Sequence, residues 1–146
     1  MKKLYVPAMG KDWNDKRRAG NGKEMFSADP LRDYLHPAWS LNEPALQIGD
    51  PTIGWLAESF GSFAYIEQSG TLEKIKIPVF IAVAGGDQII VNDAIFKASK
   101  RIPNAVPPLV LEGAQHEILM ESDQYRQAFL SGFDKFLEQN KIIPSA

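Results

Sequence analysis

Two side chains that could act together in acid and base chemistry lie in the C-terminal half of the sequence, Asp87 and His116. Each follows a segment that favours a β-strand, residues 79–84 for Asp87 and residues 106–111 for His116. Neighbouring parallel strands end at the same edge of a sheet, so the two loops can bring a carboxylate to an imidazole. In such a pair the carboxylate fixes the tautomer of the ring, and the second ring nitrogen acts as general base and then as general acid.

The residues alone leave other uses of this pair open. Asp87 could cap the turn that follows Gly85-Gly86, and His116 could lie in a solvent-exposed loop. Glu117 could orient that loop or face solvent. A metal site built from these and neighbouring acidic residues matches no known ligand spacing, and the glycine pair lacks the third glycine of a dinucleotide fingerprint. We therefore expect no metal and no cofactor.

The strands that would position the pair differ in character. Residues 79–84 are a continuous apolar run with β-branched members and no polar alternation, which is typical of a central strand covered on both faces. Residues 106–111 include Pro107 and Pro108, which cannot donate hydrogen bonds to a neighbouring strand. We expect this second strand to be short and to lie near a sheet edge.

Two segments with helical spacing follow these strands. The first can be capped by Asn92 or Asp93 and runs to about Arg101. The second runs from a Ser122 cap to about Gln139, with aromatic residues on one face. A strand–helix–strand connection of this kind is right-handed and leaves the two strands parallel. The C-terminal half therefore predicts an α/β fold with the order β-α-β-α.

The N-terminal half predicts short helices. Prolines punctuate it at Pro30, Pro37, Pro44 and Pro51. The clearest helix has Asp50 as its cap and ends at Ser69-Gly70. We divide the chain into a basic, loop-rich lead-in (1–27), a helical cap region (28–72), a C-terminal α/β core (73–140) and a tail (141–146).

Composition and charge exclude several classes of protein. A chain of 146 residues with 45% hydrophobic residues suits one globular domain, and its net charge of −2 does not favour nucleic-acid binding. The sequence has no cysteine, which removes disulfides, cysteine nucleophiles and thiolate metal sites. Its N-terminus has no apolar signal-peptide core, and its longest apolar run is far below the roughly 20 residues that span a bilayer. We expect a cytoplasmic protein with at most a peripheral contact with the inner membrane.

The ordered segments IKIPVFIAVAGGDQIIV and LVLEGAQHEILMESDQYRQAFLSGFDKFL resemble the C-terminal end of an α/β-hydrolase of the bacterial lysophospholipase and monoacylglycerol-lipase-like branch. The segment NEPALQIGDPTIGWLAESF resembles the helical cap of that family. The resemblance implies that Asp87 is the acid of a catalytic triad and His116 its histidine. It also implies a lipid-like ester as substrate, with Trp55, Phe60 and Ile89 as contacts for the acyl chain.

The nucleophile of that family is missing from the sequence. No G-x-S-x-G motif occurs, and the string Phe60-Gly61-Ser62-Phe63-Ala64 lies inside a predicted helix and follows no strand. We therefore expect two members of a triad without a serine, and little or no esterase turnover by the chain alone. A complementing N-terminal half, or a second copy, would pair with the exposed edge of strand 79–84. The alternative is a non-catalytic α/β binding or interaction module derived from a hydrolase.

Overall fold

The computed structural model describes residues 12–13 and 26–142. Most of the predicted lead-in and most of the tail lie outside these described residues. The described chain divides into two compact units, one containing residues 34–71 and the other containing residues 26–33 together with 72–142. The predicted functional pair belongs to the second unit.

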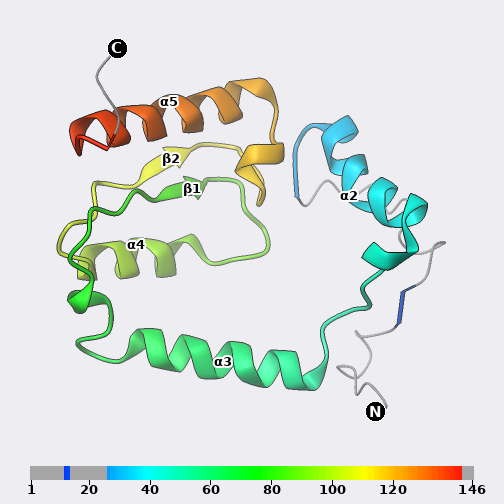
Figure 1. Ribbon diagram of the computed structural model, residues 1–146, viewed down its shortest axis with the longest axis horizontal. Helices are drawn as coiled ribbons and strands as arrows, with labels where there is room; N and C mark the ends of the chain where they lie inside the picture. Colours follow the sequence, from blue (N-terminus) through cyan, green and yellow to red (C-terminus); the bar gives the residue numbers. More distant parts are fainter. Residues whose placement is uncertain (1–11, 14–25, 143–146) are drawn as a thin grey trace. The chain divides into compact units, whose positions relative to one another are not determined.

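Four helices and two strands form the main described elements (Figure 1). In chain order they are α2 (Pro30–Asn42), α3 (Ile53–Glu67), β1 (Ala82–Ala84), α4 (Asn92–Arg101), β2 (Leu109–Leu111) and α5 (Asp123–Gln139). Short 3-10 helices occur at Pro44–Leu46, Leu72–Lys74 and Ile118–Met120. None of the described helices is long and apolar enough to span a bilayer.

Two expectations for the N-terminal helices are wrong in detail. Helix α2 continues through Pro37, which was expected to separate two segments; the proline removes one backbone hydrogen bond, and the helix tolerates that loss. Helix α3 is capped by Thr52 rather than by Asp50, because the Thr52 hydroxyl accepts the backbone N–H of Trp55 at 3.1 Å.

The sheet confirms the predicted parallel pairing of two strands. Ala82 lies opposite Leu109 and Ala84 opposite Leu111, and an isolated parallel bridge joins Val79 to Ala105. The second strand is short, as predicted, and the first is shorter than predicted because this register places Pro107 and Pro108 opposite residues 80–81. Prolines have no N–H to donate, so the regular strands begin only after them.

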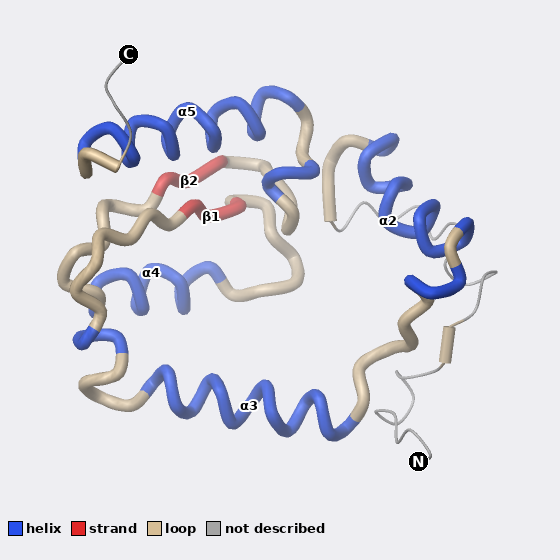
Figure 2. The backbone as a smooth tube through the Cα atoms, viewed as in Figure 1, coloured by secondary structure: helices blue, strands red, loops and turns tan. Residues whose placement is uncertain are grey.

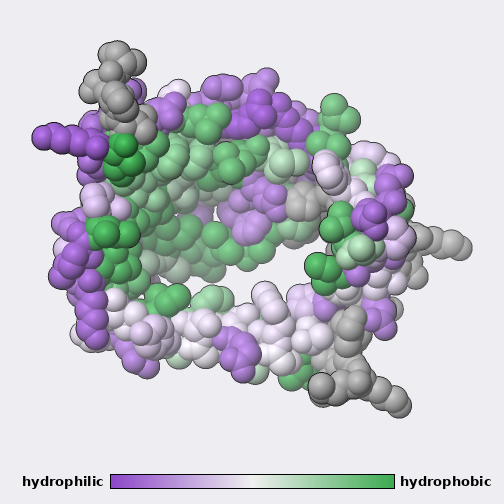
Figure 3. Space-filling view, viewed as in Figure 1, coloured by the Kyte–Doolittle hydropathy of each residue, from purple (hydrophilic) through white to green (hydrophobic). Residues whose placement is uncertain are grey.

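Helices α4 and α5 cover the sheet, with α4 beside β1 and α5 along β2 (Figure 2). Phe80 packs against three phenylalanines of α5, with ring centroids 5.6–5.9 Å apart: Phe129, Phe133 and Phe136. Figure 3 shows hydrophobic residues on the side of α5 that faces the strands and hydrophilic residues on its outer side. This layering confirms the predicted amphipathic helix and fixes the strand ends from which the functional loops leave.

The predicted cap of α4 is wrong, whereas the predicted cap position of α5 is confirmed. Val91, with no side-chain cap, precedes α4, because the Asn92 amide donates instead to the carbonyl oxygen of Ala84 at 2.9 Å. Ser122 does stand at the cap position of α5, but its hydroxyl makes no capping hydrogen bond. The backbone N–H of Ser122 donates to Glu121 Oε2 at 2.9 Å.

Candidate active site

Asp87 and His116 lie side by side at the carboxyl ends of β1 and β2. The Nδ1 atom of His116 is 2.8 Å from Asp87 Oδ2. The Asp87 side chain is only 2% exposed, whereas the His116 side chain is 30% exposed. The pair thus consists of a buried carboxylate and an imidazole that solvent or a ligand can reach.

Backbone contacts between the two loops bring the pair together. Gly85 N donates to the carbonyl oxygen of Leu111 at 2.9 Å, and Gly86 N donates to that of Ala114 at 2.8 Å. A Cβ atom on Gly85 would lie 2.9 Å from the Cα of Glu112, closer than such atoms approach. The glycine pair is therefore required by the close approach of the two loops.

The surroundings of Asp87 favour its charged form. Its Oδ1 atom accepts the backbone N–H of Ile89 at 2.7 Å and that of Ile90 at 3.2 Å. Burial alone would raise the pKa of Asp87, but the Ile89 N–H, the His116 ring and the Ile90 N–H together hold the pKa below its ordinary value of 3.8. The ionised form of Asp87 can accept a hydrogen bond from a protonated Nδ1 of His116.

His116 is also held by the segment before α2. The edge of the Phe26 ring approaches the imidazole, with centroids 6.3 Å apart and planes at 61°. The next residue, Glu117, donates its backbone N–H to the carbonyl oxygen of Phe26 at 2.8 Å. When Nδ1 donates to Asp87, the neutral ring keeps the Nε2 lone pair as a base. The arrangement can therefore move a proton at Nε2 while Asp87 steadies the ring.

The other predicted site residues are more exposed. Trp55 and Phe60 lie on α3 and are 60% and 61% exposed, and Ile89, directly after the Asp87 turn, is 43% exposed. Trp55 and Phe60 belong to the unit of residues 34–71 and Ile89 to the other unit, and their part in substrate binding stays a prediction. Ser62 lies inside α3, where its hydroxyl donates to the carbonyl oxygen of Glu58 at 2.9 Å. That position within a helix is not a strand-to-helix elbow.

Two buried polar residues were not predicted from the sequence, Glu121 and Ser27. The Ser27 hydroxyl donates to the carbonyl oxygen of Met120 at 2.8 Å and accepts the Asp29 N–H at 3.0 Å. In the sequence, the one local sign that Glu121 is buried is its position directly after the apolar residues 118–120. Among the described residues, no group of three or more acidic, histidine or cysteine side chains could hold a metal ion.

Comparisons with known proteins find partial matches. No family model matches the chain. A stretch of 94 residues, 64% of this chain, is 31% identical to the probable lysophospholipase L2 of Haemophilus influenzae, of which it covers 29%. The fold matches a crystal structure of a soluble variant of monoglyceride lipase from Saccharomyces cerevisiae in complex with a substrate analogue, with a TM-score of 0.64 and 15% identity.

The structural match covers 92% of this chain and 45% of the yeast protein. The chain therefore spans less than half the length of either relative. Both the predicted resemblance and the predicted α/β fold are confirmed. Over 94 residues this chain is thus similar in sequence to part of a probable lysophospholipase, and it has the α/β fold of part of a monoglyceride lipase.

Proposed function

We propose that this chain supplies the histidine and its orienting carboxylate to a serine hydrolase that cleaves carboxylic esters such as lysophospholipids or monoacylglycerols. The observation that carries the proposal is the 2.8 Å contact between His116 Nδ1 and Asp87 Oδ2 at the carboxyl ends of two parallel strands. The names of the two relatives, a probable lysophospholipase and a monoglyceride lipase, support the class of substrate.

In the proposed reaction, His116 Nε2 accepts the proton of a serine hydroxyl while the serine oxygen attacks the ester carbonyl. The protonated ring then gives that proton to the departing alcohol, which leaves an acyl-serine. Water attacks the acyl group with His116 again as base, and the acid and the free serine are released. Asp87 stays ionised throughout, holds Nδ1 and stabilises the imidazolium. The serine would come from sequence outside this chain, in the same polypeptide or in a separate one.

Apolar side chains would hold the acyl part of the substrate. Trp55, Phe60 and Ile89 are large and exposed, and such side chains line pockets for hydrocarbon ligands. In the proposal, they contact the acyl chain only when the serine-bearing part is also present.

The test adds a separately expressed N-terminal part of a related hydrolase, containing G-x-S-x-G, to this chain. We expect esterase activity on a monoacylglycerol only in the mixture, and its loss with His116→Gln. A fluorophosphonate probe should label the serine of the mixture and no residue of this chain alone. Stoichiometric labelling of this chain, or activity that survives His116→Gln, would refute the proposal. Lipid binding without any activity in the mixture would favour the non-catalytic binding module.

A further inference from the structure

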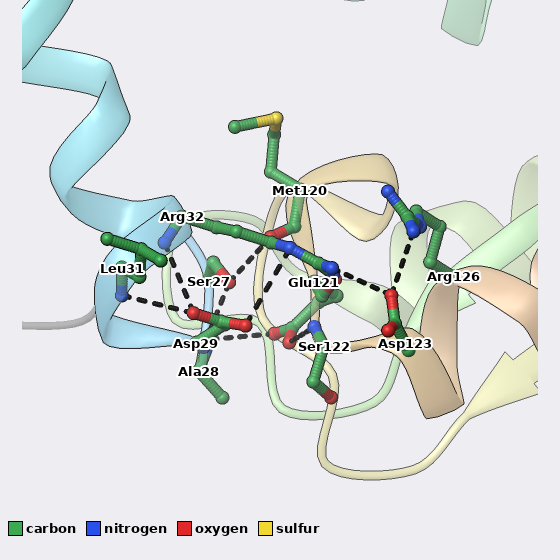
Figure 4. A network of polar contacts seen from close by, with 10 residues as sticks. All are labelled: Ser27, Ala28, Asp29, Leu31, Arg32, Met120, Glu121, Ser122, Asp123 and Arg126. Atoms are coloured by element: carbon green, nitrogen blue, oxygen red, sulfur yellow. Dashed lines mark hydrogen bonds and ion pairs between the residues drawn. The ribbon is translucent and has the colours of Figure 1, made fainter.

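Glu121 is 0% exposed, and its carboxylate accepts three backbone N–H groups, of which those of Ala28 and Ser122 are drawn in Figure 4. Its Oε1 atom accepts the N–H of Gln115 at 2.7 Å and that of Ala28 at 2.9 Å. Its Oε2 atom accepts the N–H of Ser122 at 2.9 Å. A buried carboxylate is costly unless several donors satisfy it, and here both oxygens are satisfied.

The three donors come from three different segments. Gln115 belongs to the loop that carries His116, Ser122 begins α5, and Ala28 precedes α2. Arg32 adds a further link, because its guanidinium donates to the Glu121 carbonyl oxygen and, at 2.7 Å, to Asp123 Oδ1 (Figure 4). Glu121 is thus the point at which these segments meet.

These contacts fix the backbone on both sides of His116. The preceding N–H, of Gln115, is held by Glu121, and the following N–H, of Glu117, is held by the carbonyl oxygen of Phe26. The segment that carries Phe26 is in turn tied to Glu121 through Ala28. Removal of the Glu121 carboxylate would therefore release both neighbours of His116 together.

We propose that Glu121 is a positioning residue that sets the orientation of the His116 ring toward Asp87, through Gln115 and through the segment 26–28. This inference rests on the proposed function, because the orientation matters for catalysis only if His116 is the base. In the mixture with the serine-bearing part, Glu121→Ala should lower kcat about 100-fold with little change in KM, the scale expected when a reacting group is misplaced. Glu121→Gln keeps one oxygen that can accept hydrogen bonds and should recover part of this loss.

The decisive measurement is ¹⁵N NMR of the histidine rings in this chain alone, which needs no activity. The sequence has two histidines, and the spectrum of His36→Gln identifies the signals of His116. We expect the parent chain to hold His116 in the tautomer with the proton on Nδ1. Glu121→Ala should abolish this preference while the amide signals of β1 and β2 persist, and Glu121→Gln should give an intermediate result. The control is Glu112→Gln, which changes an exposed carboxylate in the same pair of loops and should leave the His116 signals unchanged.

Two results would overturn the inference. One is an unchanged His116 tautomer in Glu121→Ala. The other is equal loss of the β1 and β2 signals in both Glu121 variants, which would make Glu121 a residue of general stability only. If the NMR result holds and the mixture has no esterase activity, the proposed function fails and the positioning of His116 by Glu121 stands.

Discussion

The backbone N–H of Gly86 donates to the carbonyl oxygen of Ala114 at 2.8 Å, which joins the loop after β1 to the loop after β2. Asp87 directly follows the donor, and His116 lies two residues beyond the acceptor. The distance between their side chains is therefore set by the backbone of the two loops. A pair fixed in this way needs little reorganisation when it acts, which is what proton transfer in an active site requires.

The first prediction concerns Gly85. Gly85→Ala places a Cβ atom 2.9 Å from the Cα of Glu112 and 3.1 Å from the Leu111 carbonyl oxygen, so the loops must separate. We expect a loss of about 1–3 kcal/mol in the free energy of unfolding, as for other overpacked sites. Urea denaturation measures this loss, and NMR should show His116 without its Nδ1 proton preference.

The matched control is Gly61→Ala on α3. A Cβ atom there meets nothing within 4 Å, and alanine favours a helix over glycine by about 0.5–1 kcal/mol. Gly61→Ala should therefore be neutral or stabilising. Equal effects of the two substitutions would contradict the requirement for glycine at position 85.

The second prediction concerns pH. The pKa of folded Asp87 lies below its ordinary value of 3.8, so its ionised form stabilises the fold at neutral pH and this contribution disappears as pH falls through the folded pKa. Asp87→Asn should cost about 1–3 kcal/mol near pH 7, because a hydrogen bond to a charged group is lost. The penalty should shrink as pH falls through the folded pKa and Asp87 becomes protonated. Urea midpoints measured over a series of decreasing pH values test this, and a penalty that stays constant as the protein is acidified would refute the prediction.

The third prediction compares two caps. Thr52→Ala removes the hydroxyl that accepts the Trp55 N–H, and such a loss costs about 1 kcal/mol. Ser122→Ala removes a buried hydroxyl that has no hydrogen-bond partner, so it should be neutral or stabilising. The rates of amide hydrogen exchange in α3 and in α5 measure the effect of each substitution on its own helix. Faster exchange throughout α5 in Ser122→Ala would show that this hydroxyl does cap the helix.

The pairing of the two functional loops and the shortness of the second strand were predictable from the sequence, whereas the length of the first strand was not. An apolar run that ends in Gly85-Gly86-Asp87, and a second strand that precedes His116, place both side chains at one edge of a parallel sheet. The length of the first strand depends on the register, which puts Pro107 and Pro108 opposite residues 80–81. Register between strands separated by a helix is a tertiary property, and no local pattern encodes it.

The support of His116 by Glu121 was not predictable for a related reason. The N–H of Ala28 that binds Glu121 comes from 93 residues earlier in the chain. A glutamate next to a predicted helix is usually a solvated residue near a positive helix end. Its burial becomes evident only when the segment 26–33 is seen against the loop of His116.

The fourth prediction concerns the open edge of the sheet. In the described part of the chain β1 pairs with β2 alone, and an unpaired edge is a template for another strand. We expect this chain, expressed alone, to form oligomers at micromolar concentration. Addition of the serine-bearing part should convert them to a complex containing one copy of each part. Light scattering distinguishes these species, and a stable monomer without a partner would argue against pairing at this edge.

The last prediction separates Asp87 from its acidic neighbour Asp93 in catalysis. In the mixture with the serine-bearing part, Asp87→Asn should lower kcat by about 10⁴-fold, because an amide at this position favours the wrong tautomer of the histidine. KM should change little, since the Asp87 side chain is buried behind His116, with which it is in contact. Asp93→Asn makes the same chemical change at an exposed position in the first turn of α4 and should leave both constants within about twofold. Steady-state kinetics on a monoacylglycerol give both constants. A similar small loss in the two variants would mean that Asp87 caps its turn and takes no part in orienting His116.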